Sequence, residues 1–125
     1  MREILFRGKR FDNDKWIEGC FVKGYSGITW IFRDEFSDRS AIMPAVIPET
    51  IGQFTGLTDK NGKRIFEGDI VQFPKLYGSG NGFIKYRFGE FKAFAQNLAY
   101  TIQENFEVIG NIHDNPELLK GETDV

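Results

Sequence analysis

The chain has 125 residues, with 16 basic and 18 acidic side chains and a formal net charge of −2 at pH 7. A chain of this length fits one domain and buries enough apolar surface to fold without covalent cross-links. Its single cysteine, Cys20, excludes an internal disulfide and a multi-cysteine metal site, and it suits a reducing compartment. The charge balance argues against binding through a broadly basic surface.

The start of the chain does not have the pattern of a signal peptide. Charge returns at Arg7, before an apolar core of sufficient length is complete. No uncharged apolar run approaches the ~20 residues that a membrane span requires. We therefore expect a soluble, intracellular protein without a membrane partner.

The first third of the chain predicts a β-hairpin. Aromatic and β-branched residues favour a strand over 15–23, and the glycines of 24–27 are typical of a hairpin loop. Thirteen phenylalanines in the whole chain add to this preference for strands. The return strand alternates, and the face that we expect to be core is Ile28, Trp30 and Phe32.

Two further expectations concern this half of the chain. Cys20 lies in an apolar strand, where a buried and inert thiol is the common state. Segment 41–47 is apolar but contains Pro44, which cannot donate a ladder hydrogen bond. We therefore expect an edge strand or an extended connector there.

The central run, residues 49–71, is the most informative part of the chain. Residues 51–57 predict a strand, and Asp59–Gly62 predict a tight turn. A second bend at Glu67–Asp69 leads into an apolar strand over 70–73. A glycine-aspartate bend of this kind is common where a small barrel turns a corner, and a bulged hairpin is the alternative.

The last third predicts further strands. Residues 74–82 form a glycine-rich loop, 83–88 alternate as a strand, and Gly89-Glu90 indicate a tight turn. Residues 91–95 then favour a strand, followed by an irregular or short helical stretch to Asn105. A last strand over 106–112, a helical turn beginning at Pro116 and a flexible tail over 120–125 complete the chain. The sequence thus predicts one mostly-β domain with minor helix over residues 1–119.

Few residues have the pattern of a catalytic site. Glu67 and Asp69 would share a face of an extended segment, and His113 is the single histidine. General acid–base catalysis needs such groups in one cleft. In a glycine-flanked bend, however, Asp69 is more typical of a residue that binds backbone N–H groups. A nucleophilic pair of Cys20 with His113 is disfavoured, because the cysteine lies in an apolar strand.

Metal and phosphate motifs are absent from the sequence. Asp59–Gly62 resembles part of a calcium loop, but the first ligand position would be Leu57 and the bidentate acid position would be Gly68. The glycines of 78–82 fit neither a dinucleotide fingerprint nor a phosphate-binding loop. We predict no metal ion and no cofactor.

A mixture of basic and aromatic residues offers a binding site. Lys75, Tyr77 and Lys85, followed by Tyr86 and Arg87, combine cations with rings on which bases of single-stranded nucleic acid stack. At this net charge the mixture is a secondary candidate. It nevertheless supplies the binding residues that the sequence suggests: Lys75, Tyr77 and Lys85.

Several stretches, taken together, resemble the YopX family of small bacteriophage and prophage proteins. They are Phe6–Lys9, Trp16–Gly19, Glu49–Leu57, Asp59–Lys63, Glu67–Val71, Glu107–Ile112 and Asn115–Leu119. They follow one another over most of the chain. Segments 34–47 and 74–104 carry no family pattern.

The resemblance implies an all-β protein with an SH3-like small barrel and additional N-terminal strands, acting in the cytoplasm of the bacterial host. No catalytic motif accompanies the family. We expect a non-enzymatic interaction module that contacts a host or phage protein. A small barrel that binds single-stranded nucleic acid is the alternative, and an enzyme that uses Glu67, Asp69 and His113 is the second alternative. Exposed strand edges also permit a homo-oligomer.

Overall fold

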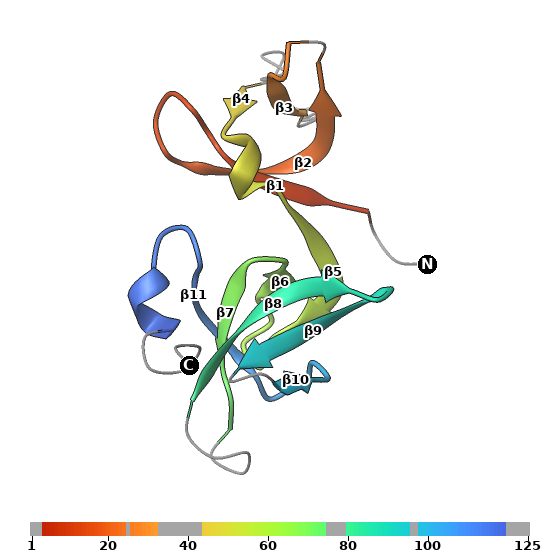
Figure 1. The fold of residues 1–125 in the computed structure, drawn as a ribbon, viewed down its shortest axis with the longest axis vertical. Helices are drawn as coiled ribbons and strands as arrows, with labels where there is room; N and C mark the ends of the chain where they lie inside the picture. Colours follow the sequence, from red (N-terminus) through yellow and green to blue (C-terminus); the bar gives the residue numbers. More distant parts are fainter. Residues whose placement is uncertain (1–3, 25, 33–43, 75–79, 96–97, 120–125) are drawn as a thin grey trace. The chain divides into compact units, whose positions relative to one another are not determined.

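A computed structural model describes residues 4–24, 26–32, 44–74, 80–95 and 98–119 (Figure 1). The regular structure of these residues is almost entirely β-strand, and their helical content is two 3₁₀ turns. The predicted all-β class with minor helix is therefore confirmed. The chain divides into two units, Met1–Phe54 and Thr55–Val125, so the expectation of one domain over 1–119 stays a prediction. The predicted tail 120–125 lies outside the described residues.

Unit 1 contains the additional N-terminal strands that the resemblance implied. They are β1 (Phe6–Lys9), β2 (Trp16–Lys23), β3 (Thr29–Phe32) and β4 (Ala45–Val46), followed by the 3₁₀ turn η1 (Pro48–Thr50). The strands lie in the order β4-β3-β2-β1, with antiparallel neighbours. The two-residue β4 is the edge strand expected near Pro44. The core of the unit is Ile17, Ile31 and Val46.

The predicted core face of β3 is wrong. Thr29 and Ile31 are buried, whereas Ile28 is 45% exposed. Thr29 and Ile31 alternate with the larger aromatic residues Trp30 and Phe32, so side-chain hydrophobicity alone favours the wrong face. Burial follows the pairing partners, because Thr29 lies opposite the buried Val46 of β4. This register turns Ile31 towards the core of unit 1.

The expectation of a buried Cys20 is also wrong, since this residue is exposed. The first half of β2 pairs with β1, from Trp16 to Gly19. Beyond Gly19 the strand pairs with β3 alone, as a two-stranded segment that begins at Cys20. Residues of two paired strands have fewer neighbours to cover them, and Phe21 and Val22 are exposed as well.

The exposure of Cys20 predicts its reactivity. We expect the thiol of the native protein to react completely with a thiol-reactive dye, at a rate comparable to that of the unfolded chain. Because the chain has one cysteine, the dye signal reports on this site alone. Cys20→Ser is the blank. Labelling that requires denaturant would contradict the structure.

Unit 2 is built on a five-stranded antiparallel sheet. Its strands are β7 (Asp69–Gln72), β8 (Asn81–Arg87), β9 (Glu90–Ala95), β10 (Leu98–Tyr100) and β11 (Glu107–Asn111), in the order β10-β9-β8-β7-β11. The 3₁₀ turn η3 (Pro116–Leu119) begins at the predicted proline. Strand β10 replaces part of the irregular or helical stretch expected before Asn105, so that expectation is wrong at 98–100.

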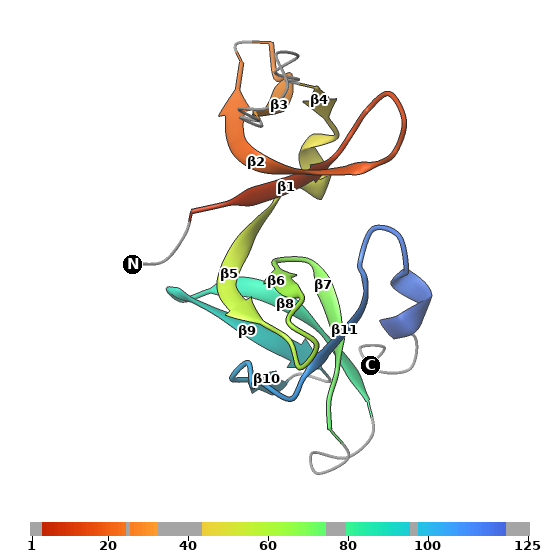
Figure 2. The ribbon, with the colours of Figure 1, turned by 180° about the vertical axis from the view of Figure 1, so that it is seen from behind.

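Strands β5 (Gly52–Thr58) and β6 (Arg64–Phe66) complete the fold. The first residues of β5 pair with β1, and the strand also neighbours β6. Figure 2 shows β6 and β7 joined by a short turn. In the described residues β10 and β11 are the two edges of the five-stranded sheet, so a closed SH3-like barrel is not confirmed. None of the helical segments described is long and apolar enough to cross a membrane.

The core of unit 2 lies on one face of this sheet. It contains Ile65, Val71, Phe73, Ile84, Ala93, Ala95, Ile102, Phe106 and Val108. Phe73 stands at its centre, with ring centroids 4.9 Å from Tyr100 and 5.2 Å from Phe106. Gly82 is required beside it, because an added Cβ would lie 2.6 Å from the Phe73 ring.

The bend at Glu67–Asp69 moves the chain from one sheet to the other, since β6 and β7 belong to different sheets. Gly68 has a φ of 93°, a value that residues other than glycine rarely adopt. The Asp69 side chain is buried, and its Oδ2 accepts a 2.7 Å hydrogen bond from the N–H of Phe66. The predicted role of Asp69 as a backbone acceptor is confirmed, and the bend is a corner between sheets.

Asp59 fixes the preceding turn and the start of β11. Its Oδ1 accepts hydrogen bonds from the N–H groups of Asn61 and Lys63, both at 2.9 Å. Its Oδ2 accepts a third, also 2.9 Å, from the N–H of Val108. Burial alone would raise the pKa of this carboxyl, but the three donors outweigh burial and the pKa lies below its usual value.

This arrangement predicts an acid-sensitive fold. Asp59→Asn should lower the free energy of unfolding at pH 7 by about 2–3 kcal/mol, because a buried amide –NH₂ cannot accept the bonds of a carboxylate. The folded pKa is lowered, so the carboxylate stabilises the fold above its unfolded pKa of ~3.9 and this contribution is lost as pH falls. Urea unfolding between neutral and acid pH measures both effects.

The control for this experiment is Asp12→Asn, which removes an exposed ion pair with Arg10 instead of a buried acceptor. We expect this variant to unfold much as the wild type does. Equal losses in the two variants, or an acid dependence that Asp59→Asn leaves intact, would contradict the assignment.

Candidate functional site

Asp69, one of the two acidic residues that the sequence offered for catalysis, has a role in the fold. Asp69 is 1% exposed and holds the Phe66 N–H, so a substrate in solvent does not contact it. His113 lies beside the same bend, with its Nε2 3.8 Å from the position of a Cβ on Gly68. Within the described ranges no three His, Cys, Asp or Glu side chains gather as metal ligands. At the same bend, Glu67 and His113 are half-buried.

The segment around His113 is fixed by side chain to backbone hydrogen bonds. Oδ1 of Asn111 accepts from the N–H groups of His113 and Asp114, at 3.0 and 2.9 Å. Nδ2 of Asn111 donates to Asp114 at 3.2 Å. These contacts close the turn between β11 and η3, which makes turn formation the visible role of these polar residues.

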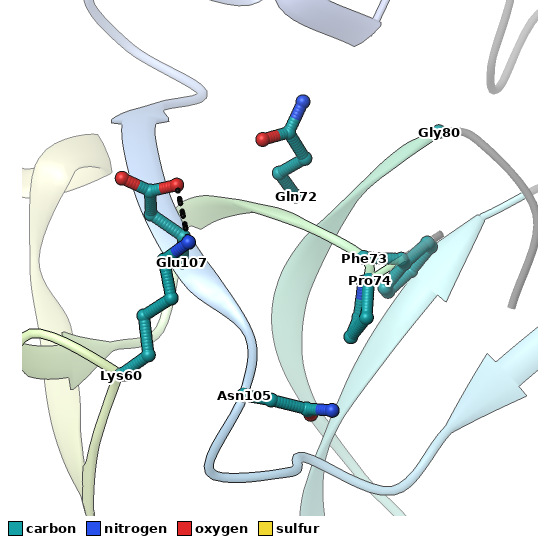
Figure 3. Close-up of a pocket in the computed structure, with 7 residues that line it drawn as sticks. All are labelled: Lys60, Gln72, Phe73, Pro74, Gly80, Asn105 and Glu107. Carbon is teal, nitrogen blue, oxygen red and sulfur yellow. Dashed lines mark ion pairs between the residues drawn. The ribbon is translucent and has the colours of Figure 1, made fainter. Parts of the chain in front are cut away.

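A pocket of about 320 Å³ lies in unit 2 (Figure 3). Its lining is Lys60, Gln72, Phe73, Pro74, Gly80, Asn105 and Glu107. Nζ of Lys60 lies 3.3 Å from Oε1 of Glu107, and Nδ2 of Asn61 lies 3.4 Å from Oε2. The two charges of the lining therefore neutralise each other, and the volume is near the lower limit for a small-molecule site. Sequence inspection missed this pocket, because its residues come from separate segments without a motif.

The hairpin of β8 and β9 is a second candidate site, and it differs from the pocket because paired strands form it. The strands pair from Phe83 with Phe94 to Arg87 with Glu90, and a two-residue loop joins them. The loop residues Phe88 and Gly89 have φ values of 54° and 86°, as a type I′ turn requires. The turn is thus centred one residue earlier than the predicted Gly89-Glu90. It projects on the side of unit 2 opposite η3 (Figures 1 and 2).

One face of this hairpin packs on the core through Ile84 and Ala93, so alternate residues point the other way. We call the other side the ribbon face. It comprises Phe83, Lys85, Arg87, Glu90, Lys92 and Phe94. The rings of Phe83 and Phe94 lie 6.1 Å apart between centroids. Basic side chains therefore follow an aromatic pair along one surface.

Of the three predicted binding residues, the structure describes Lys85. Lys85 is exposed and lies on the ribbon face, beside Arg87. Lys75 and Tyr77 lie outside the described residues. Tyr86 points to the opposite face, where its ring contacts Phe91 at 4.9 Å. Sequence reasoning missed Lys92 and Phe94, which come from the next strand and join the site through the register.

Cations dominate the ribbon face. Lys85 lies directly opposite Lys92, an arrangement of like charges that destabilises a pair of strands. Glu90 pairs with Lys92 at 3.3 Å. Arg87 places its guanidinium 5.0 Å from the ring centroid of Phe88. Among the residues that the structure describes, no carboxylate forms an ion pair with Lys85 or Arg87.

Phe88 itself is 90% exposed. Type I′ turns favour asparagine or glycine at this position, because positive φ crowds a larger side chain. An exposed ring gains nothing from burial, so both its conformation and its exposure oppose this residue. Within the chain the ring contacts the guanidinium of Arg87. Such an exposed contact is worth about 0.5–1 kcal/mol, which does not outweigh the ~1–2 kcal/mol that a left-handed conformation costs a bulky residue.

These features define a small all-β protein of two antiparallel sheets with an exposed aromatic and basic hairpin. Residues 5–120 match the family described as YopX protein. The match covers nearly the whole chain, so the chain belongs to the YopX family, as the resemblance indicated.

A crystal structure of protein EF1440 from Enterococcus faecalis is similar over 95% of this chain and 99% of that chain, with 27% sequence identity and a TM-score of 0.59. No curated protein matches the sequence significantly. The comparisons therefore give a family and a related structure without an activity.

The strained turn predicts an unusual stability change. Phe88→Asn should raise the free energy of unfolding by about 1 kcal/mol, because asparagine adopts positive φ more easily. Thermal and urea unfolding measure the change. A destabilised Phe88→Asn protein would show that the ring supports the fold, and it would remove the argument that the ring serves another purpose.

Proposed function

We propose that this YopX protein is a non-enzymatic binding module of a phage or prophage that acts in the bacterial cytoplasm. Its binding surface is the ribbon face together with the turn residue Phe88. The observation that carries the proposal is the 90% exposed Phe88 at a φ of 54°. Residues in sparsely populated backbone regions cluster at ligand-binding sites, where another gain offsets their cost.

The neighbouring residues support the same conclusion. Lys85 and Lys92 are opposed in the register although like charges repel, and Arg87 stacks on an exposed ring. The exposed Phe88, the opposed lysines and the stacked Arg87 thus all lie within the hairpin of β8 and β9. A partner with negative charge and apolar or aromatic groups relieves them together, because it compensates the cations and covers Phe88.

The rest of unit 2 is a rigid support for such a surface. Ile84 and Ala93 are fully buried on the opposite side of the same strands. Strand residues anchored in this way hold the ribbon face in position, and binding residues on regular elements are more precisely placed than those on loops. A binding function requires no reacting group, which agrees with the structural roles of Asp59 and Asp69.

The experiment compares capture of cellular partners by two matched variants. Wild-type protein, Phe88→Asn and Phe11→Asn are immobilised and exposed to lysate from phage-induced cells. Phe11 is the control because it is 75% exposed but lies in unit 1. We expect a specific partner that wild type and Phe11→Asn retain and that Phe88→Asn loses, although the last variant is well folded.

The outcomes decide as follows between the proposed surface and its alternatives. Loss confined to Phe88→Asn supports the proposed surface. Equal capture by all three proteins places any partner elsewhere and contradicts it. Absence of a specific partner, whether protein or nucleic acid, from the wild type contradicts the binding function itself. A second copy of the chain as the captured partner would make the surface a self-association site.

A further inference from the structure

We infer that the partner of the ribbon face is single-stranded nucleic acid. The inference rests on the proposed binding function and adds the chemical class of the ligand. Two kinds of group lead to it, namely stackable rings and unneutralised cations, and they lie along the same strands. This combination is what grooves for single strands use, since every base has an aromatic face and every nucleotide has a phosphate.

The rings lie at the two ends of the surface. Phe83 and Phe94 form a pair on the first rung, and both are half-buried, with part of each ring open to solvent. The neighbour of Phe94 on β10 is Ala99, a small and exposed residue that leaves the ring accessible. Phe88 stands at the other end, almost fully exposed. Bases stack on such rings with little preference for sequence.

The cations lie between the rings. Lys85 and Lys92 share the middle rung, and Arg87 follows at the turn. Glu90 is the one carboxylate of the ribbon face and pairs with Lys92. The face is therefore positive on a protein whose net charge is −2. Such a local concentration of charge complements a phosphate backbone, and the acidic remainder of the chain keeps binding weak and sensitive to salt.

The length of the surface suits a short stretch of single strand. Phe83 and Arg87 are four residues apart along β8, which is about 14 Å in a strand. At roughly 3.4 Å for each stacked nucleotide, this length corresponds to about four nucleotides. A duplex hides its base faces and presents two backbones, so it offers nothing to Phe88. An acidic peptide satisfies the cations but gains no stacking from the aromatic pair.

The test is titration of the full-length protein with a fluorescent oligothymidylate of about 12 nucleotides, long enough to cover the surface. Fluorescence anisotropy at low and at physiological salt measures the dissociation constant and its salt dependence. We expect saturable binding at low salt that weakens as salt is added, and weaker binding of a duplex of equal length.

Matched variants locate the site. Lys85→Gln should reduce the slope of log affinity against log salt by about 0.7, the value for one phosphate contact on a single strand. Phe88→Asn should weaken binding by about tenfold through loss of one stacked base. Lys15→Gln is the control, because Lys15 is an exposed cation of unit 1. It should bind as the wild type does.

The outcomes separate this inference from the proposed function. A flat titration at low salt, equal binding of duplex and single strand, or equal effects of Lys85→Gln and Lys15→Gln would overturn the inference. If binding fails while nuclease-treated lysate still yields a protein that Phe88→Asn loses, the module is a protein-binding one. If both experiments fail, the proposed function fails as well.

Discussion

The rest of unit 2 depends on the hydrogen bonds that the carboxylate of Asp59 accepts. Through Oδ1 it closes the turn after β5, and through Oδ2 it holds the N–H of Val108 at the start of β11. These two places are separated by most of the unit in sequence. A single buried side chain therefore joins the beginning of the unit to its last strand. The lowered pKa has the same origin, because three donors favour the charged form against the cost of burial.

Other polar side chains extend this mode of construction. Asp69 binds the N–H of Phe66 at the corner between the sheets, and Asn111 binds two N–H groups after β11. Each of these side chains supplies an acceptor where a bend leaves backbone donors without a ladder partner. Asp69, which the sequence offered for catalysis, thus serves the path of the backbone. The exposed charged groups of the ribbon face are other residues, among them Lys85 and Arg87.

Turns and strand positions were largely predictable from the sequence, whereas faces and partners were not. Gly62, Gly68 and Gly89 occupy positive φ values, and the sequence marks each of these bends. The prediction for β3 was wrong because its more aromatic face is the less buried one, and the register with β4 decides which face is covered. The same limit hid the proposed binding surface. Lys92 joins Lys85 through pairing between strands, and no spacing within one strand reveals this.

Phe88 is the point at which local preference and the observed structure disagree most. Among the described residues, only Asp14 and Phe88 have positive φ without being glycine. Aspartate visits this region readily because its short side chain bonds locally, so Asp14 requires no special account. Phenylalanine cannot form such a hydrogen bond, and its ring contacts the Arg87 guanidinium but is otherwise largely in solvent. Natural sequences agree with their folds at most positions and depart from them at functional ones. A departure of this kind, beside Arg87 and the opposed lysines, is the reason for proposing a binding role for this turn.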